Sequence, residues 1–271
     1  MERKGAKMKK LFSICLSVAL AFTFTVSYTF ADTNNIQNKE LSTGADQQLV
    51  DRLIEKGTDV LYEGNKKIEK LPADNGCVQI GGLTEAQKKD IQIMDVYTIT
   101  DTDVAPNEEQ AVTTIADIQF ITPEITTSAA TSDSGTKTSK GQKGRLTLTS
   151  TAWYSEKTFK SKNNTSNTGR KVTKIQSQIT KAENAGLVYN KIQTQYIGSG
   201  TYFTKAGARK VGGKYTKNYA HSVSTPMDKK VCNTSSIDRY YDIGGTGMCQ
   251  TRFNVTYGGY KVYIAIQIAK N

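Results

Sequence analysis

The sequence predicts a mainly β protein in which a small α+β domain precedes an antiparallel β-sandwich or partly open barrel. Two observations lead to this fold class. In the C-terminal half, apolar residues alternate with Thr, Ser, Gln and Lys over several short stretches that glycine-rich turns separate. Helical periodicity, by contrast, is clear only near the start of the chain. Many short strands with almost no helix favour two packed sheets.

The first 31 residues have the pattern of a secretory signal peptide. Five basic residues and one acidic residue lie within the first ten, an uncharged run extends from Leu11 to Phe30, and Thr29 and Ala31 supply small residues at a cleavage site. The alternative is a retained membrane anchor, because the run is almost long enough to span a bilayer. We expect cleavage, a mature chain that starts at Asp32, and a secreted, extracellular protein of bacterial type.

Residues 32–125 are expected to form the α+β domain. Thr43 and Asp46 make a capping-box pattern before apolar residues at helical spacing, and Thr84 with Gln87 predicts a second, short helix. Alternation then predicts two strands, 91–99 and 112–122. In the first of these strands the following residues are expected on one face: Ile91, Ile93, Asp95, Tyr97 and Ile99.

Residues 126–144 are rich in Thr, Ser, Gly and Lys, and predict a flexible linker. The sign of the charge changes inside this stretch. Residues 32–135 hold 19 acidic and 8 basic residues, a net charge of −11, whereas residues 136–271 hold 5 acidic and 23 basic residues, a net charge of +18. An intramolecular contact between the acidic and the basic domain is therefore expected.

Residues 145–271 are expected to form the basic, Tyr-rich β domain. Leu146, Leu148, Ala152 and Tyr154 recur at period two. The stretches 174–179 and 191–196 are near copies, which predicts two neighbouring strands with matching polar faces, although the first also fits a helix. The clearest hairpin joins alternating apolar residues on both sides of Gly258 and Gly259, because two glycines permit a tight two-residue turn.

The mature chain contains Cys77, Cys232 and Cys249, since Cys15 lies in the signal segment. Outside the cytoplasm, Cys232 and Cys249 predict a disulfide that leaves Cys77 unpaired. Three cysteines and the single His221 lack the close spacing of zinc ligands, so no metal site is predicted. Phosphate-loop and dinucleotide patterns are absent from the sequence, so no cofactor is predicted either.

Residues 244–252, with Cys249 between several glycines and Arg252, resemble the glycine–cysteine–arginine neighbourhood of secreted cysteine transpeptidases that modify cell walls. The resemblance implies a Cys249 nucleophile with His221 as its base. The sequence departs from this family because Gly247 is not adjacent to Cys249 and the arginine spacing differs. A disulfide at Cys249 would also remove the nucleophile, so an enzyme is the less favoured reading.

Eleven of the fourteen tyrosines follow Ser150, and many stand beside a basic residue. A flat ring next to a cation suits anionic polymers, sugars or lipid headgroups, although tyrosine and lysine are also ordinary strand residues. The candidate binding residues are these: Lys210, Lys214, Tyr215, Lys217, Tyr219, Arg239, Tyr240 and Tyr241.

The function expected from these features is that of a secreted, non-enzymatic protein. Its basic β domain would associate with an anionic cell-envelope polymer or membrane surface, and no specific nucleic acid is expected, because net charge alone selects no sequence. The main alternative is a secreted toxin or antimicrobial protein that an acidic pro-domain masks until the linker is cleaved.

Overall fold

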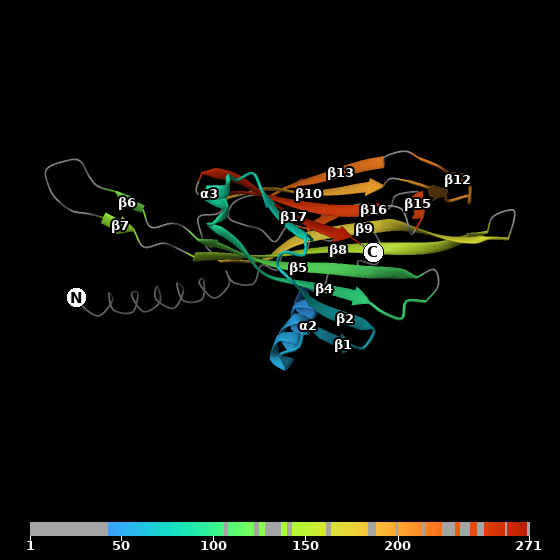
Figure 1. Ribbon diagram of the computed structural model, residues 1–271, viewed down its shortest axis with the longest axis horizontal. Helices are drawn as coiled ribbons and strands as arrows, with labels where there is room; N and C mark the ends of the chain where they lie inside the picture. Colours follow the sequence, from blue (N-terminus) through green and yellow to red (C-terminus); the bar gives the residue numbers. More distant parts are fainter. Residues whose placement is uncertain are drawn as a thin grey trace, which may run out of the picture. The chain divides into compact units, whose positions relative to one another are not determined.

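The structure is a computed structural model, and it describes residues 43–105, 108–121, 125–127, 137–139, 143–160, 164–183, 188–198, 200–212, 215–223, 231–233, 239–242, 247–257 and 259–269. The predicted signal segment and its cleavage site lie outside the described residues. Residues 41–271 form one compact unit. This unit is built mainly from two antiparallel sheets, which confirms the predicted fold class (Figure 1).

The larger sheet, sheet A, contains ten strands. In order of pairing they are β1 (Val60–Glu63), β2 (Lys66–Leu71), β4 (Ile91–Asp101), β5 (Glu109–Ile121), β8 (Lys143–Lys160), β9 (Ser166–Glu183), β15 (Arg239–Asp242), β11 (Tyr202–Thr204) and β12 (Arg209–Lys210), with β14 (Val231–Asn233) also paired to β9. Sheet B contains β13 (Tyr215–Ser222), β10 (Val188–Gly198), β16 (Gly247–Tyr257), β17 (Tyr260–Ala269) and β3 (Val78–Gly81).

The main hydrophobic core lies between the two sheets. Alternate residues of each long strand point into it, as the period of a β-strand requires. Sheet A contributes Phe120, Leu146 and Leu148, and sheet B contributes Phe253 and Ile264, all with no exposed surface. Burial of each such side chain is worth about 1.5–3 kcal/mol, so this interface is the main source of stability. Neither sheet closes on itself within the described residues, which leaves the sandwich as the architecture.

The acidic and basic segments of the chain share one sheet and one core. Strand β5 pairs with β8 from Glu109 opposite Ser155 to Ile121 opposite Lys143. Strand β3 crosses to sheet B and pairs with β17, close to the C-terminus. The predicted boundary between two separate domains is therefore replaced by a continuous β structure. The sequence pattern gives no sign of the β5–β8 and β3–β17 pairings, because each joins residues that are far apart in the chain.

The predicted linker connects two neighbouring strands of sheet A. Within it, β6 (Ile125–Thr127) and β7 (Lys137–Ser139) pair antiparallel in a small sheet of their own. Most of the other residues from 126 to 144 lie outside the described residues. The described part thus extends the β5–β8 connection as a hairpin.

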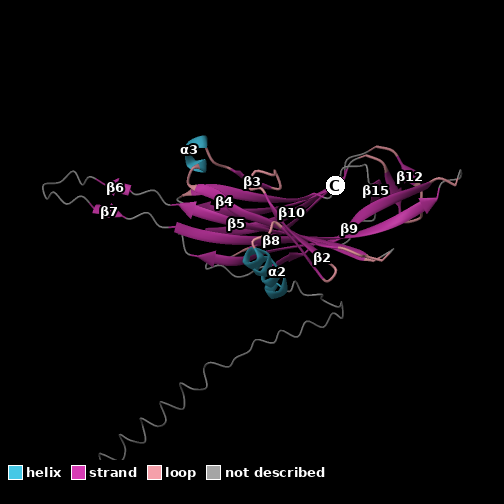
Figure 2. Cartoon of the chain, turned by 60° about the horizontal axis from the view of Figure 1, so that its bottom comes forward, coloured by secondary structure: helices cyan, strands magenta, loops and turns pink. Residues whose placement is uncertain are grey.

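The predicted first helix is confirmed as α2 (Thr43–Lys56). It covers the outer face of sheet A, meaning the face turned away from sheet B (Figure 2). Its apolar residues form a second core with β1, β2, β4 and β5, which includes Leu53, Ile68 and Tyr97. The buried Asp46 carboxylate of α2 accepts a bond of 3.1 Å from Lys66 Nζ on β2, and this ion pair fixes the start of the helix against the sheet.

Strand β4 does not keep one apolar face along its length, contrary to the prediction. A bulge between Ile93 and Asp95 inserts one extra residue against β5. The extra residue reverses the alternation, so that Ile91 and Val96 enter the core between the sheets, while Tyr97 and Ile99 enter the core under α2.

The two near-copy stretches lie in opposite sheets, and the prediction that they are neighbours is wrong. Residues 174–179 belong to β9 in sheet A, and residues 191–196 belong to β10 in sheet B. Ile175 and Ile179 point into the main core from one side, as Ile192 and Tyr196 do from the other. The repetition therefore reflects the same inward pattern in both layers of the sandwich.

Two predicted local motifs are confirmed. The hairpin β16–β17 has Tyr257 opposite Tyr260, and Gly259 in its turn has φ +82°, a value that favours glycine. The second helix is the short α3 (Glu85–Lys88), where the Gln87 side-chain oxygen accepts the Thr84 backbone N–H at 2.9 Å.

A cluster of three hydroxyl groups connects the two sheets inside the core. Ser150 Oγ lies 2.8 Å from Ser177 Oγ and 2.7 Å from Thr251 Oγ1, and Ser177 Oγ lies 2.7 Å from Thr251 Oγ1. All three residues are fully buried. A buried hydroxyl without a partner is costly, so this hydroxyl cluster specifies which parts of the two sheets face each other.

Replacing Thr251 with Val should lower the free energy of unfolding by about 1–3 kcal/mol. The change keeps the shape of the side chain but removes two hydrogen bonds inside the core. Thr216→Val, at an exposed edge position, should change it by less than about 0.5 kcal/mol. Urea unfolding measures both values, and equal effects of the two changes would contradict the role of the hydroxyl cluster.

Candidate functional site

A surface of lysines over aromatic rings lies on the outer face of sheet A, where β8 ends and β9 begins. Lys174 Nζ lies 4.7 Å from the centre of the Trp153 ring, and Lys171 Nζ lies 5.1 Å from that of Tyr240. Lys157 Nζ lies 5.5 Å from the Phe159 ring. We refer to Lys157, Lys171 and Lys174 with these rings as the basic surface. Each contact is worth about 0.5–1 kcal/mol at an exposed site and restricts the lysine side chain.

Strand pairing places these residues on one face. Trp153, Ser155 and Lys157 alternate along β8, and their partners on β9 are Lys174, Lys171 and Gly169. Cross-strand partners share a face of the sheet. The bulge between Trp153 and Tyr154 accommodates one extra residue of β9, so that both Lys171 and Lys174 reach the outer face.

An aromatic cluster supports the basic surface from below. Phe159 stacks on Phe203 with ring centres 4.6 Å apart, and Tyr240 meets Phe159 edge-on at 5.4 Å. Gly169 makes room for this cluster, because a Cβ there would lie 2.9 Å from Tyr240 Cβ and 3.1 Å from the Phe203 ring. The rings that hold Lys157 and Lys171 are thus themselves fixed by packing.

The three lysines of the basic surface have no carboxylate within ion-pair distance in the part of the chain that the structure describes. The acidic residue Asp242 lies on the same face, opposite Gly169. Glu156 lies on the other face and bonds to Arg170 Nε at 2.7 Å. The ammonium groups are therefore held in place without internal neutralisation, a property suited to an external anion.

The structure does not bring the predicted binding residues together. Lys210 and Arg239 lie at the β11–β12–β15 end of sheet A, on the face of the Tyr202 ring, whose centre is 4.7 Å from the Arg239 guanidinium carbon. Lys217 and Tyr219 lie on β13, in sheet B, with Lys217 Nζ 5.1 Å from the Tyr219 ring. Tyr215 begins the same strand, and Lys214 lies outside the described residues.

Tyr240 and Tyr241 are buried, with 8% and 2% of their surface exposed. They are adjacent in β15, so they point to opposite faces, Tyr240 into the aromatic cluster and Tyr241 into the main core. Neither ring can stack on a ligand. Sequence reasoning missed Lys157, Lys171 and Lys174, because only the β8–β9 register shows that they share a face with Trp153 and the aromatic cluster.

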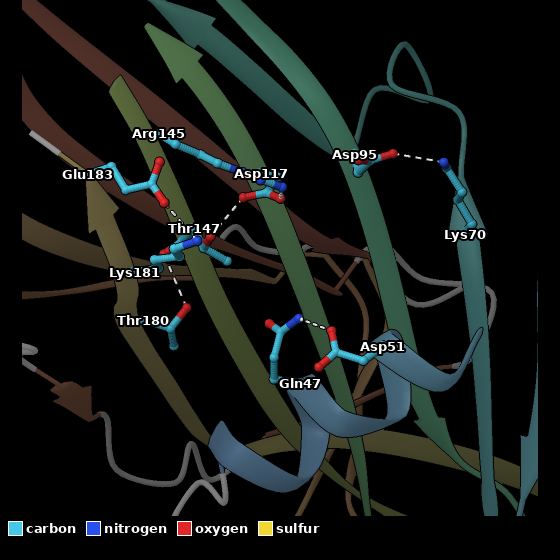
Figure 3. Close-up of polar contacts among 10 residues, drawn as sticks. All are labelled: Gln47, Asp51, Lys70, Asp95, Asp117, Arg145, Thr147, Thr180, Lys181 and Glu183. Atoms are coloured by element: carbon cyan, nitrogen blue, oxygen red, sulfur yellow. Dashed lines mark hydrogen bonds and ion pairs between the residues drawn. The ribbon is translucent and has the colours of Figure 1, made fainter. Parts of the chain in front are cut away.

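A second feature is a groove of about 560 Å³ between α2 and the outer face of sheet A (Figure 3). Gln47, Val50, Asp51 and Ile54 of α2 form one wall. Its floor consists of side chains from four strands, listed here in chain order: Asp95, Tyr97, Ile115, Asp117, Arg145, Thr147, Gln178, Thr180 and Lys181. We call this cavity the α2 groove. Its volume is in the range of ordinary small-molecule sites.

The charged groups on the floor of the α2 groove form ion pairs, whereas Asp51 on the α2 wall bonds the neutral Gln47 amide. Asp117 forms an ion pair with Arg145, which raises the pKa of that guanidinium, and accepts a bond of 2.7 Å from Thr147 Oγ1. Lys70 Nζ bonds Asp95 at 2.8 Å, and the hydrogen bond raises the pKa of Lys70. The Asp117–Arg145 pair also joins the acidic segment of the chain to the basic one.

Cys249 is a free, fully buried thiol, and the structure therefore lacks the predicted bond to Cys232. It lies on β16, in sheet B, whereas Cys232 lies on β14, in sheet A. Burial raises the pKa of the Cys249 thiol to about 12, so it stays protonated and unreactive at neutral pH. Cys77 is half-buried and also free.

His221 cannot serve Cys249 as a base in this arrangement. Along β10, His221 is opposite Ile192, and Cys249 is opposite Tyr196. Four residues of strand separate these positions by about 13 Å, in addition to the distance across two strand pairings. The geometry therefore does not form the pair that the resemblance to cysteine transpeptidases implies.

Among the described residues, no group of three or more His, Cys, Asp or Glu side chains has the geometry to hold a metal ion. No helix in the described part of the chain has the length and apolar character needed to cross a membrane. Comparison with known proteins gave no match to any family model, curated protein or solved structure. The function must therefore be inferred from the basic surface and the α2 groove themselves.

Cys249 should resist iodoacetamide at pH 8 in the native protein and react once urea is added. Because folding raises the pKa of the Cys249 thiol, the unfolded chain loses the thiol proton at a lower pH than the folded protein does. The contribution of this thiol to the free energy of unfolding therefore declines as the pH rises above about 9. Peptide mass spectrometry measures the labelling. Rapid native labelling of Cys249, or a bond between Cys249 and Cys232, would contradict this assignment.

Proposed function

We propose that the protein is a secreted, non-enzymatic binding protein whose basic surface attaches it to an anionic cell-envelope polymer. The observation that supports this most is the arrangement of Lys157, Lys171 and Lys174 over aromatic rings with no carboxylate partner in the described part of the chain. The net charge of +18 on residues 136–271 adds long-range attraction.

The rings lower the cost of binding. A free lysine side chain loses up to about 2 kcal/mol of conformational entropy when it is immobilised. Lys171 and Lys174 are already half-buried against Tyr240 and Trp153, so these side chains have lost part of their conformational entropy before a ligand binds. A surface of mobile lysines would attract the same anions but hold them less firmly.

The shape of the basic surface favours an extended polymer over a small anion. From Trp153, which is opposite Lys174, to Lys157, β8 advances by four residues, or about 13 Å of strand. Charges spread over this length contact several anionic groups of one chain at once. A single phosphate or carboxylate would reach one lysine, and its attraction would be screened within about 10 Å at ~0.1 M salt.

The intact chain, with its acidic segment, is the binding form in this proposal. Strands β3, β4 and β5 belong to that segment, and Phe120 and Ile118 of β5 are fully buried in the main core. Release of the segment would expose this core and the long edge of β8. The sheet pairing therefore favours a permanent binding protein over a toxin that cleavage unmasks.

Replacing Lys157, Lys171 and Lys174 together with Gln should weaken binding to poly(glycerol phosphate) at least tenfold. A control triple, Lys89→Gln, Lys191→Gln and Lys261→Gln, removes the same charge from exposed positions elsewhere and should have a much smaller effect. Titration calorimetry at several salt concentrations measures both. The dependence of log K on log salt should become shallower by about 2–3 for the first triple, since each neutralised phosphate contributes about one.

The proposal fails if both triples weaken binding equally, because attraction would then follow net charge alone. It fails also if the wild-type chain binds the polymer with no dependence on salt. Gly169→Ala provides a further check, because it should disturb the aromatic cluster and weaken binding while leaving every charge in place.

A further inference from the structure

The floor of the α2 groove contains one row of polar side chains that crosses four strands. Strand register places Asp95 of β4 opposite Asp117 of β5, Asp117 opposite Thr147 of β8, and Thr147 opposite Lys181 of β9. At about 4.8 Å between strands, the row spans roughly 14 Å. Along the floor the row thus presents two carboxylates, a hydroxyl and an ammonium group, and Figure 3 shows these side chains.

The charges of this row are already neutralised inside the molecule. Asp117 pairs with Arg145, Asp95 with Lys70, and Lys181 Nζ lies 2.8 Å from Glu183. A charged ligand would have to compete with these partners. An uncharged ligand can instead use the remaining lone pairs and N–H groups, which the ion pairs hold in fixed directions.

The opposite wall of the α2 groove offers both hydrogen-bonding groups and apolar surface. On α2, the Gln47 amide donates to Asp51 Oδ1 at 3.0 Å, which leaves the second carboxylate oxygen and the amide oxygen able to accept. Ile54 on the same wall is 56% exposed and supplies the apolar surface. A ligand suited to both walls has many hydroxyl groups and an apolar C–H face.

We infer that the α2 groove is a binding site for an uncharged oligosaccharide. Sugar hydroxyls both donate and accept, as the paired carboxylates, amides and threonines of the groove require, and the C–H face of the ring packs on the exposed Ile54. The site lies on the same outer face of sheet A as the basic surface but uses different residues, so each can be tested without the other.

The test uses triacetylchitotriose and maltotriose as uncharged probes, with the purified full chain and titration calorimetry up to about 10 mM probe. Gln47→Trp should fill the groove and weaken saccharide binding at least tenfold. Gln48→Trp is the matched control, because Gln48 is the neighbouring exposed residue of α2 and does not line the groove. Binding of poly(glycerol phosphate) should be the same in both variants.

A second pair of variants keeps the test valid if tryptophan disturbs the helix. Asp51→Ala removes an acceptor of the groove wall, whereas Glu55→Ala removes a carboxylate from an exposed position of α2 outside it. Only the first should weaken saccharide binding. The inference is overturned if neither probe binds, if Gln47→Trp and Asp51→Ala bind as tightly as their controls, or if the zwitterionic dipeptide Lys-Glu binds more tightly than both saccharides.

Discussion

The pairing of β5 with β8 is the constraint on which the other features of the structure depend. It joins the acidic and basic segments of the chain in one sheet and brings Asp117 beside Arg145 and Thr147. With the β8–β9 pairing, it also fixes which side chains of β8 face outward. At one end of β8 these residues line the α2 groove, and at the other end Trp153 and Lys157 belong to the basic surface.

The two candidate sites differ because charge is distributed differently along the same long strands. Around the α2 groove, acidic residues of β4 and β5 neutralise the bases of β2 and β8. At the other end of β8, where the pairing with β5 stops at Ser155, Lys157, Lys171 and Lys174 rest on aromatic rings and have no carboxylate within ion-pair distance in the described part of the chain. One end of sheet A thus suits a neutral ligand and the other an anionic one. The hydroxyl cluster and the buried Cys249 belong to the core that supports both.

Local patterns in the sequence predict much of the fold, while the sites depend on long-range pairing. The β16–β17 hairpin, α2 and the Thr84 capping box follow from residues that are close in the chain. The bulge in β4 and the placement of the near-copy strands in opposite sheets do not, because a single shift of register changes which face a residue occupies. Tyr240 and Tyr241 are adjacent in a strand and point to opposite faces, so the sequence alone predicts that one ring is exposed. In the structure Tyr241 lies in the main core, and the aromatic cluster buries the outward Tyr240 as well.

The most direct test of the account is hydrogen–deuterium exchange of the full chain with and without poly(glycerol phosphate). Strand amides are already slow to exchange, so the informative changes are expected where the basic surface meets the turns and strand ends of β8, β9 and β11. The account predicts added protection in peptides covering residues 153–160, 166–174 and 200–210, with little change in β10, β13 and β17. Protection spread over all lysine-bearing peptides, or centred on β13, would contradict the proposal that the basic surface is the binding site.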